Sequence, residues 1–267
     1  MSILIGCDPE LFLKKDGLFR SAYGLIKGDK KNPFPVDKGA VQVDGMALEL
    51  NIHPASSAEE FSQNIETVLT QMKAMVPEYE VVATPTAEFE LEYFASQPHD
   101  ALALGCEPDF NAYSFEENPR PRTDKPIRTG GGHIHIGWGE GLDTSKGSDH
   151  FFHCASLTRV LDTYVGSLSL LWDADDERRG LYGRAGAFRP KSYGVEYRVL
   201  SNKWMSDKRL ISLVFSKVST AFSTWMDGYS GNVVYQDIIN KSKIDSVIQV
   251  FFVEFNYLRK EGLYESR

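Results

Sequence analysis

The sequence predicts an α+β fold. Segments that alternate like strands and segments with the spacing of amphipathic helices both occur, but they do not follow the regular βαβ order of a parallel sheet. No change in composition and no proline-, serine- or glycine-rich linker divides the 267 residues. We therefore expect a single domain over residues 1–267.

The first half of the chain is expected to be mainly β structure. The predicted strands are residues 3–13, 19–23, 41–53 and 80–84, and the third is interrupted near Asp44-Gly45. Residues 27–38 are rich in Lys, Asp and Pro, which is typical of an exposed loop. Ser57-Ala58-Glu59-Glu60 matches a capping box, and apolar residues then recur at helical spacing until Pro77. This pattern predicts the first helix.

The second half mixes helices with shorter strands. Residues 88–105 are compatible with either helix or loop. The glycines of residues 129–132 precede a predicted strand at His133–Ile136, and Val195–Leu200 alternates as another strand. Helical spacing predicts helices over about residues 149–176, 207–226 and 244–259.

Composition and charge exclude several classes of protein. The net charge is -8 and no block of consecutive basic residues occurs, which disfavours binding to nucleic acid. No apolar run is long enough to span a bilayer, and the N-terminus lacks the features of a signal peptide. The three cysteines are odd in number and have no C-x-x-C spacing. We expect a cytoplasmic protein that binds neither nucleic acid nor membrane, while its oligomeric state stays open.

Four of the expected strands collect metal-binding side chains on one face. Residues two apart in a strand point to the same side, so each segment can be sorted without knowledge of the fold. A strand with one solvated face alternates routinely, but such faces usually mix Lys, Thr, Ser and Glu. The four faces instead contain Asp8 with Glu10, Glu49 with Asn51 and His53, His133 with His135, and Glu196 with Arg198.

If these faces converge, their negative charges require cations. Several ionised carboxylates cannot share one site without compensation, and bound metal provides it. Carboxylate oxygens with an imidazole favour Mg²⁺ or Mn²⁺, whereas the Cys and His sets of structural zinc sites are absent from the sequence. The metal candidates are Asp8, Glu10, Glu49, His133 and Glu196.

A basic, glycine-punctuated run at residues 178–191 is a candidate site for an anion. Arginine forks match phosphate or carboxylate oxygens, and glycines let backbone N–H groups approach them, although a solvated loop would explain the run equally well. Its candidate ligands are Arg184, Arg189 and Lys191. Gly130-Gly131-Gly132 is not a phosphate-binding P-loop, because the following Lys-Ser/Thr is missing. We expect a tight turn or a close approach there.

Four motifs, taken in order, resemble a known family. They are residues 6–12, 49–54, 132–137 and 193–202, which read GCDPELF, ELNIHP, GHIHIG and YGVEYRVLSN. The set resembles the phage-type carboxylate-amine ligases, an amidoligase family with the fold of glutamine synthetase and glutamate-cysteine ligase. The resemblance implies a curved, mostly antiparallel sheet with helices on its convex side, and a concave face that holds Mg²⁺ and ATP.

The resemblance also implies roles for single residues. Asp8, Glu10 and Glu49 look like acidic metal ligands, and His133 or His135 would meet metal or nucleotide. Glu196 with Arg198 is similar to a Glu-x-Arg pair in which Glu196 holds metal and Arg198 contacts the phosphoryl group that is transferred. Arg184, Arg189 and Lys191 would then bind ATP phosphates.

The implied activity is ATP-dependent amide formation. The substrate carboxylate would attack the γ-phosphate to give an acyl phosphate, which an amine displaces with release of ADP and phosphate. Small molecules or peptides that present a carboxylate and an amine are the expected substrates, and a phage-encoded enzyme would act in the host cytoplasm. Two alternatives stay open: a metal-dependent hydrolase or oxygenase that uses the His-x-His pair, and a non-catalytic binding module on the same scaffold.

Overall fold

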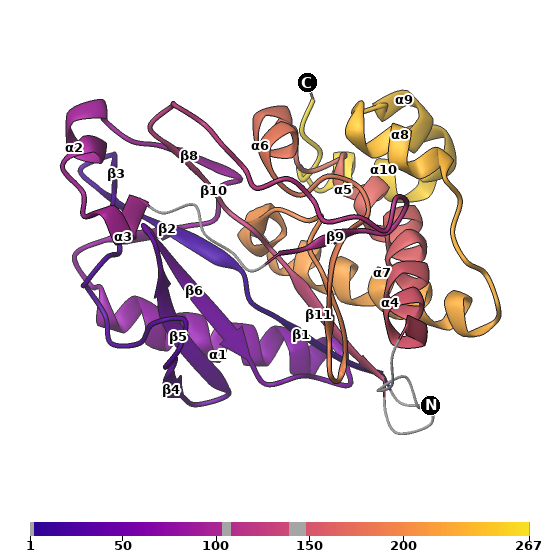
Figure 1. The fold of residues 1–267 in the computed structure, drawn as a ribbon, viewed down its shortest axis with the longest axis horizontal. Coiled ribbons are helices and arrows are strands. Elements are labelled where there is room, and N and C mark those ends of the chain that lie inside the picture. The colour runs from indigo at the N-terminus through magenta and orange to yellow at the C-terminus, as the bar shows by residue number, and fades with distance from the viewer. Residues whose placement is uncertain (1–2, 103–107, 139–147, 267) are drawn as a thin grey trace.

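The α+β class is confirmed in a computed structural model of the chain, which describes residues 3–102, 108–138 and 148–266. Antiparallel sheets and helices share one fold (Figure 1). The strands divide between a five-stranded sheet, a six-stranded sheet and a separate pair. The pair consists of β8 (Thr86–Glu88) and β10 (Ile127–Thr129).

The five-stranded sheet joins segments from both halves of the chain. Its strand order is β1-β11-β13-β12-β9, and every pairing is antiparallel. The strands are β1 (Ile3–Cys7), β11 (Ile134–Trp138), β13 (Gly194–Tyr197), β12 (Ala187–Lys191) and β9 (Phe110–Asn111). The N-terminal strand therefore lies beside the His-x-His strand.

The six-stranded sheet is built from residues of the first third of the chain. Its order is β3-β2-β6-β5-β4, with β7 also paired to β2. The strands are β3 (Leu18–Arg20), β2 (Glu10–Lys15), β6 (Ala47–Ile52), β5 (Gly39–Asp44), β4 (Phe34–Val36) and β7 (Glu80–Val82). The backbones of Ile5 and Ala55 exchange hydrogen bonds of 2.9 and 2.8 Å, which join this sheet to the other.

The prediction of one strand over residues 3–13 is wrong. The segment contains two strands, β1 and β2, and they belong to different sheets. The break falls at Asp8-Pro9, where proline has no N–H to donate to a ladder. Instead Asp8 N donates to His133 O at 3.3 Å, and Glu10 N donates to Gly131 O at 2.9 Å. The break thus places Asp8 and Glu10 at the junction of the two sheets.

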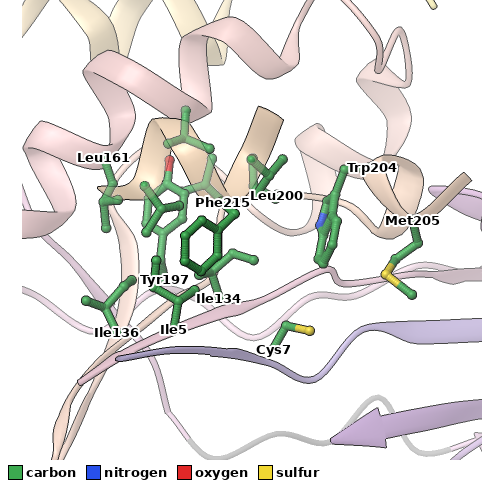
Figure 2. Packing of buried hydrophobic residues seen from close by; sticks show 14 of the residues in the cluster. Ile5, Cys7, Ile134, Ile136, Leu161, Tyr197, Leu200, Trp204, Met205 and Phe215 are labelled. Carbon is green, nitrogen blue, oxygen red and sulfur yellow. The ribbon is translucent and has the colours of Figure 1, made fainter. Parts of the chain in front are cut away.

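Helices cover the apolar face of the sheets. Ser57 caps α1 by accepting a hydrogen bond from Glu60 N at 3.2 Å, as the capping box predicts. Ile5, Ile136 and Tyr197 point toward these helices (Figure 2), within a cluster that also contains residues of α1, α4 and α7. The longer helices are α1 (Ala58–Met75), α4 (Ser148–Leu161), α7 (Lys208–Met226) and α10 (Phe252–Lys260).

Short helices complete the described chain. They are α2 (Leu91–Ala95), α3 (His99–Leu102), the π-helical turn η1 (Asp162–Gly166), α5 (Ser167–Ser169), α6 (Asp176–Leu181), the 3₁₀ turn η2 (Asn202–Ser206), α8 (Val234–Asn240) and α9 (Ile244–Val250). In the described part of the chain, every helix is too short or too polar to span a membrane.

Several predicted boundaries need correction. The helix expected over residues 149–176 ends at Ser169 after its π-helical turn, and the one expected over 244–259 is divided between α9 and α10. The strand expected at Val195–Leu200 ends at Tyr197. The basic run at residues 178–191 is not a loop, since it contains the end of α6 and the whole of β12.

Candidate active site

The polar residues sorted by alternation do lie on one face of the two sheets. Glu10 is paired with Glu49 across β2 and β6, and His135 is paired with Glu196 across β11 and β13. Their apolar neighbours in the same strands are buried against the helices. A pocket of about 380 Å³ opens on this face, which is within the size range of small-molecule sites.

One cluster of possible ligand atoms combines residues from three strand segments. Asp8, His135 and Glu196 each offer an atom within 4.8 Å of the others. His135 Nε2 lies 3.1 Å from Asp8 Oδ2, and His133 Nδ1 lies 3.3 Å from Asp8 Oδ1. Glu196 is fully buried, so this arrangement lies at the base of the face rather than on its rim.

The charges around Asp8 fix its protonation state. Burial alone would raise the pKa of the Asp8 carboxyl, but His135 and His133 hold that pKa well below its usual range. Burial lowers the pKa of His135, yet Asp8 reverses this, and the net pKa is raised. Burial and the nearby Arg198 lower the pKa of His133. Asp8 is therefore ionised, and of its two imidazole neighbours His135 holds a proton more readily than His133.

Three basic side chains surround the carboxylate of Glu196. Arg189 Nη1 donates to both of its oxygens, at 3.2 and 3.1 Å, and Lys191 Nζ lies 2.9 Å from Oε2. Arg198 also donates to Glu196, and its Nε donates to Asp109 Oδ2 at 3.1 Å. These pairs keep a buried carboxylate beside a set of cations that open onto the pocket.

A second acidic cluster lies where the six-stranded sheet meets the pocket. Glu10, Asp44 and Glu49 each place an oxygen within 4.8 Å of the others. Burial and the neighbouring carboxylates raise the pKa of Glu10 to about 7 and raise that of Glu49 well above its usual range. Gln42 Nε2 donates to Glu49 Oε1 at 2.8 Å, and Lys30 lies 2.8 Å from Asp44. The cluster has more acid than these partners neutralise.

The three consecutive glycines hold Glu10 in place. Gly131 N donates to Glu10 Oε2 at 2.7 Å, while Gly131 O accepts from Glu10 N. A Cβ atom at Gly131 would lie 2.4 Å from His133 Nε2, and one at Gly132 would lie 2.2 Å from Ser201 O. The sequence predicted a close approach at these glycines, and the atoms that approach them belong to the protein itself. This packing brings the glycine segment against Glu10 and His133.

The donor set fits divalent cations. Asp8 Oδ1 and His135 Nε2 are buried and make no well-aligned hydrogen bond among the described residues. Glu49 is buried and Glu10 half-buried, and the two carboxylates repel each other as long as both are ionised. Oxygen-rich sets of this kind suit Mg²⁺ or Mn²⁺, which would occupy these ligand atoms and remove the repulsion.

Not every candidate from the sequence reaches the pocket. Arg184 is exposed, and it lines a neighbouring pocket of about 180 Å³ while donating to Gly180 O at 2.9 Å. His53 is exposed and lies beyond the end of β6. Arg178 is buried and donates to the carbonyls of Gly130, Val199 and Leu200, so it binds the backbone rather than an external anion.

The site also contains residues that were not predicted. Asp44, Lys30 and Arg128 line the pocket, and Asp109 orients Arg198. The sequence did contain a signal for Asp44. The Asp44-Gly45 turn fixes the register of a hairpin in which Gln42 is the partner of Glu49. Asp44 is two positions after Gln42, so it lies on the same face as Glu49. Lys30 and Asp109 lie outside the strands and have no periodic pattern that could identify them.

Fold and site together define a class of protein in which an antiparallel β face gathers carboxylates, imidazoles and cations in one pocket. Residues 128–226 match the model of the family described as phage phiEco32-like COOH.NH2 ligase-type 2. The match confirms the resemblance to carboxylate-amine ligases, and it spans His133, His135, Glu196 and Arg198. Asp8, Glu10, Asp44 and Glu49 precede the matched stretch. No curated protein matches the chain.

Proposed function

We propose that this protein is an ATP- and Mg²⁺-dependent ligase that joins a carboxylate to an amine through an acyl phosphate. The observation that carries the proposal is that two clusters of metal-ligating side chains adjoin one pocket, which Asp8, Glu10, Asp44 and Glu49 line together with a row of cations. Carboxylates alone would suit metal, and arginines alone would suit an anion. Their combination suits a metal-bound polyphosphate.

Two sets of residues would hold divalent cations. Asp8, His135 and Glu196 form one set, and Glu10, Asp44 and Glu49 form the other. His133 is the remaining metal candidate, and it is within 3.3 Å of Asp8 and 3.7 Å of Glu196. Bound divalent cations would supply positive charge that screens the phosphates and favours nucleophilic attack on them.

The basic residues would orient the phosphates. Arg189, Lys191 and Arg198 line the pocket on the side of Glu196, Lys30 lines it beside Asp44, and Arg128 also belongs to the lining. Arg198 is 3 % exposed and its Nε is fixed by Asp109, so its guanidinium is preorganised at little further entropic cost. It is our candidate for the group that stabilises charge on the phosphoryl group during transfer.

The reaction would proceed in two displacements. An oxygen of the substrate carboxylate attacks the γ-phosphorus as the bond to ADP breaks, which gives an acyl phosphate. The amine then attacks the acyl carbon, loses a proton and expels phosphate. We propose that residues 1–267 act as one catalytic domain in the cytoplasm, where ATP is available, on small molecules or peptides.

The decisive experiment follows oxygen atoms. The enzyme is incubated with ATP, Mg²⁺, a pool of amines and a pool of ¹⁸O-labelled carboxylates, and the products are resolved by mass spectrometry. An acyl phosphate transfers one ¹⁸O atom from the carboxylate to inorganic phosphate for each ADP formed. Release of AMP, or phosphate without label, would exclude the proposed route.

Matched variants separate the site from general effects of the substitution. Glu196→Gln should reduce turnover by about 100-fold or more, because it removes a charge in contact with Arg189, Lys191 and Arg198. Glu59→Gln makes the same chemical change at an exposed position in α1 and should leave turnover unchanged. Copurified Fe or Zn with no thermal shift from ATP and Mg²⁺ would favour the hydrolase or oxygenase alternative instead.

A further inference from the structure

Another cavity, the side pocket, continues the face that carries the main pocket of about 380 Å³. It has a volume of about 330 Å³, and its lining includes Leu4, Gly6, Asn51, His135, Gly137 and Tyr193. The main pocket and the side pocket follow each other along three strand segments. Each segment gives one residue to each pocket, two positions apart on the same face: Asp8 and Gly6, Glu49 and Asn51, and His133 and His135. The two pockets are therefore neighbours on one face.

The floor of the side pocket is bare because two strand positions have no side chain. Gly6 lies in β1 and Gly137 in the neighbouring strand β11. Gly6 is paired with His135, and Gly137 is paired with Leu4, so each glycine lies beside one of these two side chains. Neither has a positive φ, and a Cβ atom at either would meet other atoms only at 3.7 Å or more. Alanine would fit at both places without strain.

The neighbouring Gly194 differs in this respect. It has a φ of 153°, and a Cβ atom there would lie 2.0 Å from Ile136 O, so the backbone itself requires glycine. Glycine in a strand interior costs about 0.5–1 kcal/mol relative to alanine, and where the backbone does not require it, it often marks a bulge, a bend or a place that a ligand or another backbone approaches closely. The register between β1 and β11 is regular at both glycines, which leaves the close approach. Gly6 and Gly137 fit this description.

The walls of the side pocket are apolar, and they include one unsatisfied donor. Leu4 and Tyr193 are 44 % and 45 % exposed although both are large apolar or aromatic residues. Asn51 Nδ2 is buried and has no hydrogen-bond partner among the described residues. An amide donor suits the oxygen of a carboxylate or carbonyl group, while the open walls suit a hydrocarbon body.

We propose that the side pocket binds the hydrocarbon body of the carboxylate substrate, with the Asn51 amide donating to an oxygen of that substrate. This inference rests on the proposed ligase function and adds to it the chemical class of one substrate. The substrate is an acid with an apolar side chain or tail, oriented so that its carboxylate lies toward Asp8 and His135. Gly6 and Gly137 determine how large that body is.

The test measures binding of straight-chain acids from acetate to octanoate by isothermal titration calorimetry, with Mg²⁺ and a non-hydrolysable ATP analogue present. For the wild-type protein the affinity should rise about fourfold for each added methylene until the side pocket is full. An affinity that does not depend on chain length would overturn the proposal.

Two kinds of variant distinguish the role of the glycine floor from that of the Asn51 donor. Gly137→Ala and Gly6→Ala should weaken the binding of octanoate at least about tenfold and leave the binding of acetate unchanged, because the new methyl groups occupy the floor of the side pocket. Asn51→Ala should weaken every acid by a similar factor of about ten, because it removes a hydrogen bond to a charged group. Equal losses for acetate and octanoate in Gly137→Ala would contradict the proposed floor.

Control measurements keep this test distinct from that of the ligase function. Both glycine variants should keep their melting temperature, since alanine is at least as favourable as glycine in a strand, and should bind the ATP analogue as the wild type does. If the analogue binds and the acids show no dependence on chain length, the side-pocket proposal is wrong. If the acids show that dependence and the analogue never binds, the ligase function is wrong and the apolar acid site stands.

Discussion

Glu10 and Glu49 face each other across two paired strands, and Asp44 lies beside both of them. Like charges at such a distance destabilise the folded chain unless a cation or protons compensate them. Lys30 lies against Asp44, and Gln42 donates a hydrogen bond to Glu49. We therefore propose that these three carboxylates are metal ligands rather than a structural cluster.

The first prediction concerns Asp44→Asn. Loss of one ligand charge should weaken the binding of Mg²⁺ at least about tenfold. This removes about 1.4 kcal/mol of the stabilisation that saturating Mg²⁺ provides. The increase in melting temperature on adding Mg²⁺ should then be smaller by about 3–6 °C for a chain of this size. Asp37→Asn, in an exposed turn, is the control. An unchanged Mg²⁺ response in Asp44→Asn would exclude Asp44 as a ligand.

The second prediction concerns Arg178, whose buried guanidinium binds three backbone carbonyls beside the site. Arg178→Met would leave those carbonyls without partners, so we expect a loss of about 3 kcal/mol or more in the free energy of unfolding. Arg184→Met, at an exposed position, should change it by less than about 0.5 kcal/mol. Urea unfolding measures both. Equal stability of the two variants would refute a structural role for Arg178.

At the scale of elements, the π-helical turn η1 supports strand β13. Asp162, at its start, is fully buried and accepts hydrogen bonds from Tyr197 at 2.7 Å and from Tyr113 at 2.9 Å. Tyr197 follows Glu196 in the chain and precedes Arg198, so the turn fixes the end of β13 between the two residues of the Glu-x-Arg pair. Burial raises the pKa of Asp162 from 3.8 to about 7, against the lowering effect of these hydrogen bonds.

The third prediction is a pH dependence that arises in this element. Because the folded-state pKa of Asp162 is raised, its protonation favours the folded protein. This contribution to the free energy of unfolding is complete below about pH 4 and is lost as the pH rises to about 7. The difference in free energy of unfolding between the wild type and Asp162→Asn should therefore shrink between pH 5 and pH 8, with Mg²⁺ saturating throughout. A difference that stays constant with pH would show that Asp162 does not titrate as stated.

Alternation predicted the site better than it predicted the strands. The period of two holds in β6, β11 and β13, so Glu49, His135 and Glu196 were assigned to the correct face from sequence alone. The period says nothing of which sheet a strand joins, and the break before Pro9 was missed for that reason. β12 was also missed, because Pro190 and the surrounding basic residues are atypical of a strand.

For the whole molecule, the predicted class was correct because the order of strands and helices is visible in the sequence. The division into two sheets could not be predicted from the sequence, because it depends on pairings between distant segments such as β1 with β11. The same limit applies to the site. The convergence of the four polar faces followed from the family resemblance and not from the alternation, and the pairings at Glu10 and His135 now account for it.

The fourth prediction follows from the net charge of the polar face. In the metal-free protein, burial and the neighbouring acids raise the pKa of Glu10 from 4.5 to about 7, so stability should fall as the pH rises through this interval. Saturating Mg²⁺ should reduce this slope, because the cation replaces the protons. Thermal unfolding between pH 5 and pH 8, with EDTA or with Mg²⁺, provides the comparison. Parallel curves in the two conditions would contradict it.

The central claim is that the polar face binds the phosphates of a nucleotide through divalent cations. Calorimetric titration with a non-hydrolysable ATP analogue tests it most directly, in Mg²⁺ and in EDTA. Binding should require Mg²⁺, should be lost in Asp8→Asn and Glu49→Gln, and should persist in Glu59→Gln. Binding that is equally tight in EDTA, or no binding with any divalent cation, would contradict the claim.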